Sequence, residues 1–517
     1  MSLLKFISAI WFFTFVFYIF APTANATNKS QLLVINQVRG EECCDKGSLE
    51  NLKTQVEASI KYKIPAYFAI RYDALIDPHY ADYLKASMTA HPDLIKPAVF
   101  FEITPNLAKE SSVIYKGTDE SWFGAENIFS IGYSNEDNKK MADLLFSNFK
   151  NTFGFYPEIS TAWMIKTNLL NYLHEAYGLK VTEITREQIG TDSYTLDGGP
   201  PHYPYPAGKS WLFIPDYEEN DSVLIVRQTI TDPLFNYGDT TSSFTSQPND
   251  YLRNKSFTYF KPLIDQALFE QKQTGFTLLG LENSMAGNFQ KEYIKQLDLI
   301  RSYADKNMIV FPSVDDLRTF WNNKKLSVYQ GSDLVKGTNN NAYWITTPRY
   351  RVRLRMEDGK VYISDIRIYD TGFSDPYGSR LAQREGFWIV PYLLNSSIQE
   401  KKDKNILNLF DPQPMPVNNF TSVVSDTNGT QDKINLPDVK GKPDITMSDD
   451  EIKFRYNSKK GTVNLVFKAN SILTTGISKD DLKIADTFSN QLINEKVECS
   501  NNNCKLTFTS NNQFGYF

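Results

Sequence analysis

The chain has 517 residues, of which 41% are hydrophobic and 22% are charged, and its net charge is −5 at pH 7. This composition excludes a disordered chain and a polytopic membrane protein, and the length predicts roughly two to four domains. The chain has 55 basic and 60 acidic residues. It therefore has no excess of positive charge with which to bind nucleic acid in general.

The N-terminus predicts export. Lys5 precedes an apolar run at 6–21, and the small-x-small motif Ala24-Asn25-Ala26 follows it. A charged start, an apolar stretch and such a motif characterise a secretory signal peptide. We therefore expect 1–26 to be a signal peptide and the protein to be secreted, periplasmic or on the cell surface. An uncleaved N-terminal membrane anchor is the alternative, and membrane attachment is expected only through this segment.

Between 31 and 323, apolar strand-like runs alternate with helical stretches. The strands are predicted at 32–35, 66–70, 98–101, 128–131, 161–165, 181–184, 223–226, 277–281 and 309–311. Apolar strands separated by helices predict a parallel sheet with helices outside it. About seven or eight such units predict a closed (β/α)7–8 barrel rather than an open sheet.

Beyond 326 the pattern changes from helical periodicity to alternation. The run from Arg349 to Arg355 alternates charged and apolar residues, which predicts a strand with a solvated arginine face. We expect a β-rich domain at 326–410, a Pro- and Asn-rich loop or linker at 411–443, and a C-terminal β module at 444–517. The predicted fold class is therefore α/β, a (β/α)7–8 barrel followed by all-β, sandwich-like modules.

The four cysteines are expected in an oxidising compartment. Cys499 and Cys504 flank a polar turn between two strand-like stretches, which favours a disulfide, with two free thiols as the alternative. Cys43 and Cys44 are adjacent, and the sequence leaves open whether they form a vicinal disulfide, pair elsewhere or stay reduced. No second cysteine pair or nearby histidine completes a zinc site, so no metal and no cofactor are expected.

Charged residues follow the predicted barrel strands, where the functional residues of such barrels lie. This rule selects Arg39, Glu41, Arg71, Glu102, Asp192, Arg227 and Glu282. Carboxylates and arginines together suit a polar cleft for a hydroxylated ligand. Ion pairs that close the barrel mouth are the alternative.

A Gly- and Pro-rich loop at 198–211 carries several aromatic side chains. They are His202, Tyr203, Tyr205 and Trp211. Glycine and proline exclude regular structure here and stiffen the loop. Rings on a stiff loop above a polar cleft suit the apolar face of a sugar, and a self-packed loop is the alternative.

The segment 157–188 resembles the third sequence region of glycoside hydrolase family 57. Pro157, Trp163-Met164-Ile165 and Tyr177-Gly178 stand in the order of that family, and Leu281-Glu282-Asn283-Ser284 is similar to its fourth region. Polysaccharide deacetylases and uncharacterised extracellular bacterial proteins of this barrel superfamily are similar more loosely. The resemblance covers about 31–323, implies a seven-stranded barrel that acts on carbohydrate, and places Trp163 and Lys166 in the binding site.

The departures from the family concern its catalytic residues. The nucleophilic Glu of the family corresponds to Lys166, and its acid/base Asp corresponds to Gly280. Lys166 would hold a carboxylate ionised or contact an acidic group of the substrate. The paired Asp and the H-x-x-x-H motif of the deacetylases are missing too, which disfavours a metal-dependent deacetylase.

These observations predict a glycoside hydrolase-like protein that acts on a poly- or oligosaccharide through cleft carboxylates. Glu282 and Asp192 are the leading catalytic pair, with Glu102 and Glu41 in reserve. A retaining enzyme needs two carboxyl groups about 5–5.5 Å apart and an inverting enzyme about 6.5–9.5 Å. The alternatives are a non-catalytic glycan-binding protein on a degenerate barrel and a structural protein of the cell surface whose barrel mouth is plugged.

Overall fold

The computed structural model describes residues 29–42, 46–218, 221–235, 244–271, 273–357, 360–369, 371–383 and 385–390, together with the strands beyond 390. The predicted signal peptide and the pair Cys43–Cys44 lie outside the described residues. No helix in the described part of the chain is long and apolar enough to span a bilayer.

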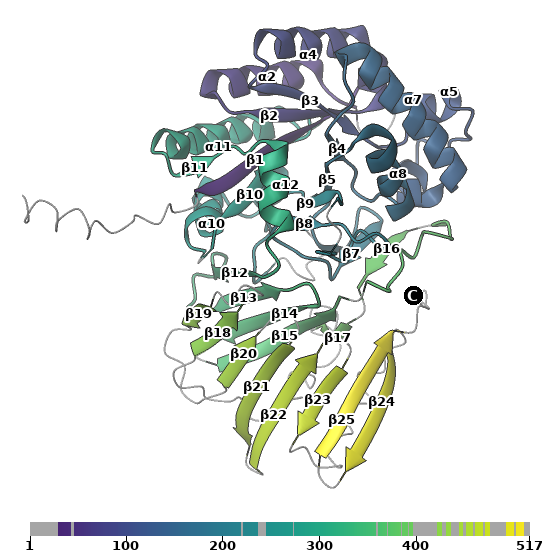
Figure 1. Cartoon of the computed structure of the whole chain (residues 1–517). Coiled ribbons are helices and arrows are strands. Elements are labelled where there is room, and N and C mark those ends of the chain that lie inside the picture. Colours follow the sequence, from purple (N-terminus) through teal and green to yellow (C-terminus); the bar gives the residue numbers. More distant parts are fainter. Residues whose placement is uncertain are drawn as a thin grey trace, which may run out of the picture.

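The larger part of the molecule is built around a curled, mainly parallel sheet (Figure 1). Its parallel strands follow the order β10-β1-β2-β3-β4-β5-β9. Their bounds are β1 (Ser30–Val38), β2 (Ala66–Ile70), β3 (Ile95–Phe100), β4 (Ile159–Thr161), β5 (Val181–Ile184), β9 (Leu224–Arg227) and β10 (Phe276–Leu279). β8 (Tyr205–Pro206) extends β9 antiparallel, and β11 (Ile309–Val310) pairs with β1. The predicted barrel is confirmed, although no pairing among the described residues joins β9 to β10 and so closes it.

Helices cover the outside of this sheet (Figure 1). They are α2 (Leu49–Tyr62), α3 (Tyr72–Ile76), α4 (Pro78–Ala90), α5 (Pro105–Glu110), α6 (Ala125–Ile128), α7 (Asn135–Phe153), α8 (Thr167–Tyr177), α9 (Pro248–Tyr251), α10 (Phe257–Phe269), α11 (Gly287–Asp305) and α12 (Val314–Asn322). Their starts follow local rules: the Ser48 and Ser134 hydroxyls accept the backbone N–H groups of Asn51 and Asp137, at 3.3 and 3.0 Å. Such caps satisfy N–H groups that have no partner within a helix.

The predicted strand at 128–131 is wrong. The segment folds as the end of α6 and the 3-10 turn η1 (Ser130–Gly132). Ile128, Phe129 and Ile131 are buried all the same, and a short apolar run does not distinguish a strand from a buried turn. The strand predicted at 161–165 ends at Thr161, so β4 occupies 159–161 instead.

A small sheet joins two distant parts of the chain. β7 (Tyr194–Asp197) pairs with β6 (Gln188–Thr191) in a hairpin and, in parallel, with β16 (Gly386–Ile389). In the same returning segment, the Asp375 carboxylate accepts the backbone N–H and the hydroxyl of Thr167, at 2.8 and 2.9 Å. The first turn of α8 is therefore fixed by residues from beyond the barrel.

The predicted C-terminal β region is confirmed as two sheets, of which the first is antiparallel and the second is antiparallel except for the parallel pair β18–β20. The first has the order β12-β13-β14-β15-β17, with β12 (Ser327–Ser332), β13 (Asn341–Thr346), β14 (Tyr350–Glu357), β15 (Lys360–Ile368) and β17 (Tyr392–Asn395). The second contains β18 (Thr421–Ser425), β19 (Gln431–Asn435), β20 (Asp444–Met447), β21 (Glu451–Ser458), β22 (Gly461–Lys468), β23 (Ser471–Thr475), β24 (Ile493–Ser500) and β25 (Asn503–Ser510).

Two details of the second sheet bear on the sequence predictions. The stretch 411–443, predicted as a loop or linker, contains β18 and β19, so that part of the prediction is wrong. The β-branched residues Thr421, Val423 and Val424 are typical of a strand. In the hairpin of β24 and β25, Cys499 is the register partner of Cys504. The disulfide between them stays a prediction.

Arg351 and Arg353 of β14 are buried and Arg355 is half-buried, which corrects the predicted solvated face. Arg351 and Arg353 are 1% and 2% exposed. Arg351 binds both oxygens of Asp365 on β15, each at 2.9 Å, and also Glu187 from the barrel. Arg353 donates to the Leu234 carbonyl at 2.7 Å. The arginine face therefore attaches the first β sheet to the barrel, through the Arg351–Glu187 ion pair and the hydrogen bond from Arg353 to Leu234.

We predict that Arg351→Ala lowers the free energy of unfolding by about 3–5 kcal/mol, because Glu187 and Asp365 stay buried without their guanidinium. Urea unfolding followed by circular dichroism measures this loss. The control is Arg349→Ala, because the side chains of Arg349 and its partner Glu218 are 34% and 81% exposed. An exposed pair contributes at most about 1 kcal/mol, and equal losses in the two variants would contradict the prediction.

Candidate active site at the barrel mouth

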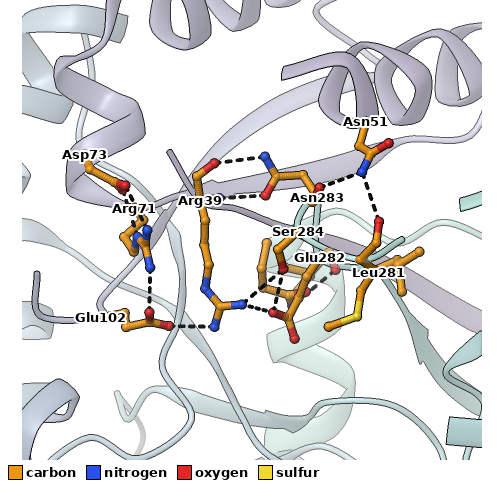
Figure 2. Close-up of polar contacts among 12 residues, drawn as sticks. Arg39, Asn51, Arg71, Asp73, Glu102, Leu281, Glu282, Asn283 and Ser284 are labelled. Atoms are coloured by element: carbon orange, nitrogen blue, oxygen red, sulfur yellow. Dashed lines mark hydrogen bonds and ion pairs between the residues drawn. The ribbon is translucent and has the colours of Figure 1, made fainter. Parts of the chain in front are cut away.

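Four predicted site residues meet at the carboxyl ends of the barrel strands (Figure 2). Arg39 directly follows β1, Arg71 directly follows β2, and Glu102 and Glu282 come shortly after β3 and β10. Since parallel strands end at the same edge of a sheet, their following residues converge there. The sequence rule therefore selected side chains that contact one another.

Glu102 lies at the centre of a buried ion-pair network. It accepts Nη1 of Arg71 at 2.7 Å and Nη2 of Arg39 at 2.8 Å, and its side chain is 0% exposed. Nε and Nη2 of Arg71 bind the two oxygens of Asp73, both at 2.8 Å. Burial opposes the charge of Arg71, but Asp73 and Glu102 outweigh it and raise the Arg71 pKa. The arginine in turn lowers the pKa of Asp73 against the effect of burial.

Glu282 is the more accessible of the two glutamates that bind Arg39. Nη1 of Arg39 donates to Oε2 of Glu282, and the side chain of Glu282 is 12% exposed. The Ser284 hydroxyl lies 3.5 Å from the same oxygen. Figure 2 shows the guanidinium of Arg39 between Glu102 and Glu282. One buried cation thus fixes two carboxylates, of which only Glu282 reaches the surface of the mouth.

Asn283 fixes the backbone that carries these charges. Its Oδ1 accepts the Arg39 N–H at 2.8 Å, and its Nδ2 donates to the Arg39 carbonyl at 2.9 Å. The side chain of Asn51 on α2 donates to the carbonyls of Asn283 and Met285, at 2.9 and 3.0 Å. The loop after β10 is therefore held in one position relative to β1.

The two positions that carry catalytic carboxylates in family 57 are unsuited to that role here. A Cβ atom on Gly280 would lie 1.7 Å from the carbonyl oxygen of Ile35, so the backbone leaves no room for an aspartate. Lys166 is 2% exposed and donates from Nζ to the Tyr133 carbonyl at 2.8 Å. Burial lowers the pKa of Lys166 to about 8. Any catalysis must therefore use other carboxylates.

Asp192 and Glu41 lie at the periphery of the mouth. Asp192 is exposed in the turn between β6 and β7, with φ of 52°. Burial raises the pKa of Tyr194, the charge of Asp192 raises it further, and Arg39 acts in the opposite direction. The charges of Asp192 and Arg39 thus both act on this tyrosine. Glu41 is exposed in the loop after β1.

The remaining predicted binding residues are buried in packing contacts. His202 stacks on Tyr329 with ring centroids 3.8 Å apart, and Tyr203 stacks on Trp321 at 5.0 Å. The other members of this group share this burial, each being 6% exposed or less: Trp163, Tyr205, Trp211 and Arg227. The loop at 198–211 therefore packs between the barrel and β12, and its rings do not stand over an open cleft.

Glu183 on β5 is a buried acid that the sequence rule did not select. Its Oε2 accepts the Thr161 hydroxyl at 2.6 Å and the Gln37 amide at 2.8 Å. Burial raises the pKa of Glu183 to about 8, so the carboxyl group is protonated at neutral pH. An acidic residue inside the run Val181-Thr182-Glu183-Ile184 was the available signal, since unpaired acids are rarely buried.

Glu42 follows the first strand, as the strand-end rule requires, and it contacts the network although it is not among the predicted catalytic residues. Its backbone N–H donates to Asp73 at 3.1 Å, and its Oε1 accepts the Asn106 N–H at 2.6 Å. Burial raises the pKa of Glu42, and the Asp73 charge raises it further. Hydrogen bonds with Thr104 and Asn106 act in the opposite direction. No cluster of three or more His, Cys, Asp or Glu side chains suited to a metal ion occurs in the described ranges.

Comparison with solved structures identifies the barrel. A Parabacteroides distasonis protein described as a glycoside hydrolase/deacetylase matches with a TM-score of 0.54 and 14% identity, over 75% of this chain and 99% of that one. A Pseudomonas aeruginosa protein described as a polysaccharide deacetylase has a TM-score of 0.34 at 11% identity, covering 56% and 91% of the two chains. A family 57 branching enzyme from Thermococcus kodakaraensis has a TM-score of 0.33 at 8% identity, covering 55% and 70%.

No protein-family model and no curated protein match the chain. The chain therefore shares the barrel fold of the Parabacteroides distasonis protein, and at 14% identity this likeness concerns the fold alone.

We predict that Glu183→Gln removes a pH dependence of stability. Between its ordinary value of 4.5 and its folded pKa of about 8, Glu183 keeps its proton in the folded state and loses it on unfolding. The wild-type stability therefore falls as pH rises through this window, by up to about 1.4 kcal/mol per pH unit. Glutamine retains the acceptor oxygen and does not titrate.

Urea unfolding of both proteins from pH 5 to pH 8 tests this. The variant should gain stability relative to wild type as pH rises. A difference between the two proteins that stays constant across this range would contradict a protonated Glu183.

Proposed function

We propose that this chain is an extracytoplasmic glycoside hydrolase-like protein that acts on a poly- or oligosaccharide at the barrel mouth, with Glu282 as the functional carboxylate. The observation that carries the proposal is the position of Glu282 at the end of β10. It is held by the buried guanidinium of Arg39 and is still 12% exposed. The fold is compatible with a carbohydrate ligand but does not by itself establish function.

The charges of the mouth suggest how the roles divide. An arginine partner stabilises a carboxylate anion, and a base or nucleophile must be an anion. Glu282 suits that role. Glu102 is enclosed by two arginines and serves to position Arg39. Asp192, exposed in the turn between β6 and β7, is the candidate for the second carboxylate that glycoside hydrolysis requires.

A non-catalytic glycan-binding protein is the second candidate. It is favoured by the replacement of both family carboxylates, because Gly280 admits no side chain and Lys166 is a buried cation. It is also favoured by the ion pairing of Glu102, because each of its two carboxylate oxygens binds an arginine. In this case Arg39 and Glu282 would bind sugar hydroxyls without reaction.

We predict that Glu282→Gln abolishes sugar release. A reducing-sugar assay over a panel of polysaccharides, run beside a glycan array, compares wild type with this variant. The loss should be at least about 100-fold, since general acid–base groups contribute that much or more, while glycan binding persists. Glu57→Gln is the matched control, because Glu57 is exposed on α2 and should retain full activity.

The other outcomes separate the candidates. Binding without release in the wild type, retained in Glu282→Gln, would identify a glycan-binding protein. Neither binding nor release would overturn the carbohydrate proposal.

The location outside the cytoplasm is part of the proposal and has its own test. The sequence around Ala24-Asn25-Ala26 predicts that the exported protein begins at Thr27. N-terminal sequencing of protein recovered from the medium or envelope measures this. A protein found only in the cytoplasm would contradict it, and an exported protein that begins at Met1 would indicate the uncleaved anchor.

A further inference from the structure

An exposed group of aromatic side chains lies on the loop between α5 and α6, at residues 111–124. Phe123 is 51% exposed, and Tyr115 and Trp122 are partly buried beside it. We call these three residues the aromatic shelf. The neighbouring Ile114 is 85% exposed. Exposed apolar groups gathered in one loop, rather than scattered singly, mark an interaction site.

The loop that carries the shelf is fixed by hydrogen bonds. The backbone N–H of Thr118 donates to the Ser121 hydroxyl at 3.1 Å, and the Asn127 side chain donates to the Ser121 carbonyl at 2.6 Å. The Ser193 hydroxyl, in the turn between β6 and β7, donates to the Phe123 carbonyl at 2.9 Å. The rings are therefore presented on a pre-organised backbone, which reduces the entropy that binding would cost.

The loop that carries the shelf starts and ends at the barrel mouth. The backbone N–H of Ile103, the residue after Glu102, donates to the Ile128 carbonyl at 2.9 Å, so the segment between them leaves and returns beside the carboxyl end of β3. Burial raises the pKa of Tyr115 to about 12, and the charge of Glu102 raises it further. At Phe123 the loop meets Ser193, the residue next to Asp192. The shelf therefore lies on a loop anchored both beside the buried network and at the turn that carries Asp192.

The side chains around the shelf are polar. Lys116, Asp119 and Glu120 are exposed in the same loop. Trp122 and Phe123 meet edge to face, with ring centroids 6.0 Å apart and planes at 89°. An aromatic face bordered by charged and hydrogen-bonding groups matches a sugar ring, which has an apolar C–H face and a rim of hydroxyl groups.

We propose that the aromatic shelf binds a distal sugar unit of the oligosaccharide whose reacting unit lies at Glu282, with its C–H face on Phe123. This inference rests on the proposed function, and it makes the ligand a chain of several neutral sugars rather than a single one. Short ligands occupy the mouth alone, whereas longer ones also cover Tyr115 and reach Phe123. Affinity should therefore rise with chain length.

Calorimetric titration with neutral oligosaccharides of the gluco, xylo, manno and N-acetylglucosamine series, from disaccharides to hexasaccharides, tests the shelf. Phe123→Ala should weaken hexasaccharide binding by about tenfold, as expected for the loss of an aromatic contact. Disaccharide binding should be unchanged, and Phe123→Tyr should retain the wild-type affinity for both lengths.

Phe155→Ala is the matched control. Phe155 is 41% exposed, but it precedes β4 and so lies towards the amino ends of the strands, away from the mouth. This variant should bind every oligosaccharide as the wild type does. Circular dichroism confirms that each variant is folded.

The outcomes distinguish this inference from the proposed function. If Glu282→Gln alters binding or release while Phe123→Ala binds hexasaccharides like the wild type, the proposed role of the shelf is overturned and the proposed function stands. Equal weakening of disaccharide and hexasaccharide binding in Phe123→Ala would also overturn a distal site. If the wild type binds none of these sugars, both proposals fail, and a protein partner becomes the explanation of the exposed rings.

Discussion

The pairing of buried arginines with carboxylates is the constraint on which the rest of the structure depends. Arg39 and Arg71 follow adjacent strands and are nearly inaccessible to water, so each must find an anion. Glu102 binds both arginines, Asp73 also binds Arg71, and Glu282 also binds Arg39. Because the pairs connect the ends of β1, β2, β3 and β10, they fix the shape of the mouth. A ligand there meets a pre-arranged set of charges rather than flexible side chains.

The same rule joins the barrel to the first β sheet. Arg351 and Arg367 are direct register partners on β14 and β15, which would be repulsive for two cations in isolation. Asp365 binds both of them, while Glu187 and Asp197 come from the barrel side. The turn that carries Asp192 belongs to the hairpin that ends at Asp197. The sheet therefore stabilises the segment that borders the mouth, although it lies far along the chain.

Sequence reasoning succeeded where the physical rule is local or topological. Apolar runs predicted the parallel strands, and the convergence of strand ends predicted that Arg39, Arg71, Glu102 and Glu282 would meet. It failed where the partner lies far away in sequence. The alternation at Arg349–Arg355 describes a strand equally well whether its charged face meets water or Glu187. The sequence does not distinguish rings at 198–211 that stack on a sugar from rings that stack on Trp321 and Tyr329, because only the three-dimensional packing decides between these alternatives.

The lack of a side chain at position 280 and the presence of the Arg39–Glu282 pair have a common cause. Gly280 lies so close to Ile35 that no Cβ fits. Past that point the chain stays against β1, because Leu281 donates to the Asn36 side chain at 3.2 Å and Asn283 donates to the Gln37 carbonyl at 3.0 Å. This continued contact places Asn283 against the Arg39 backbone and Glu282 on the Arg39 guanidinium. An aspartate at 280 would force β10 away from β1 and break that arrangement. In this backbone, the close approach of β10 to β1 that excludes a side chain at 280 therefore also places Glu282 on Arg39.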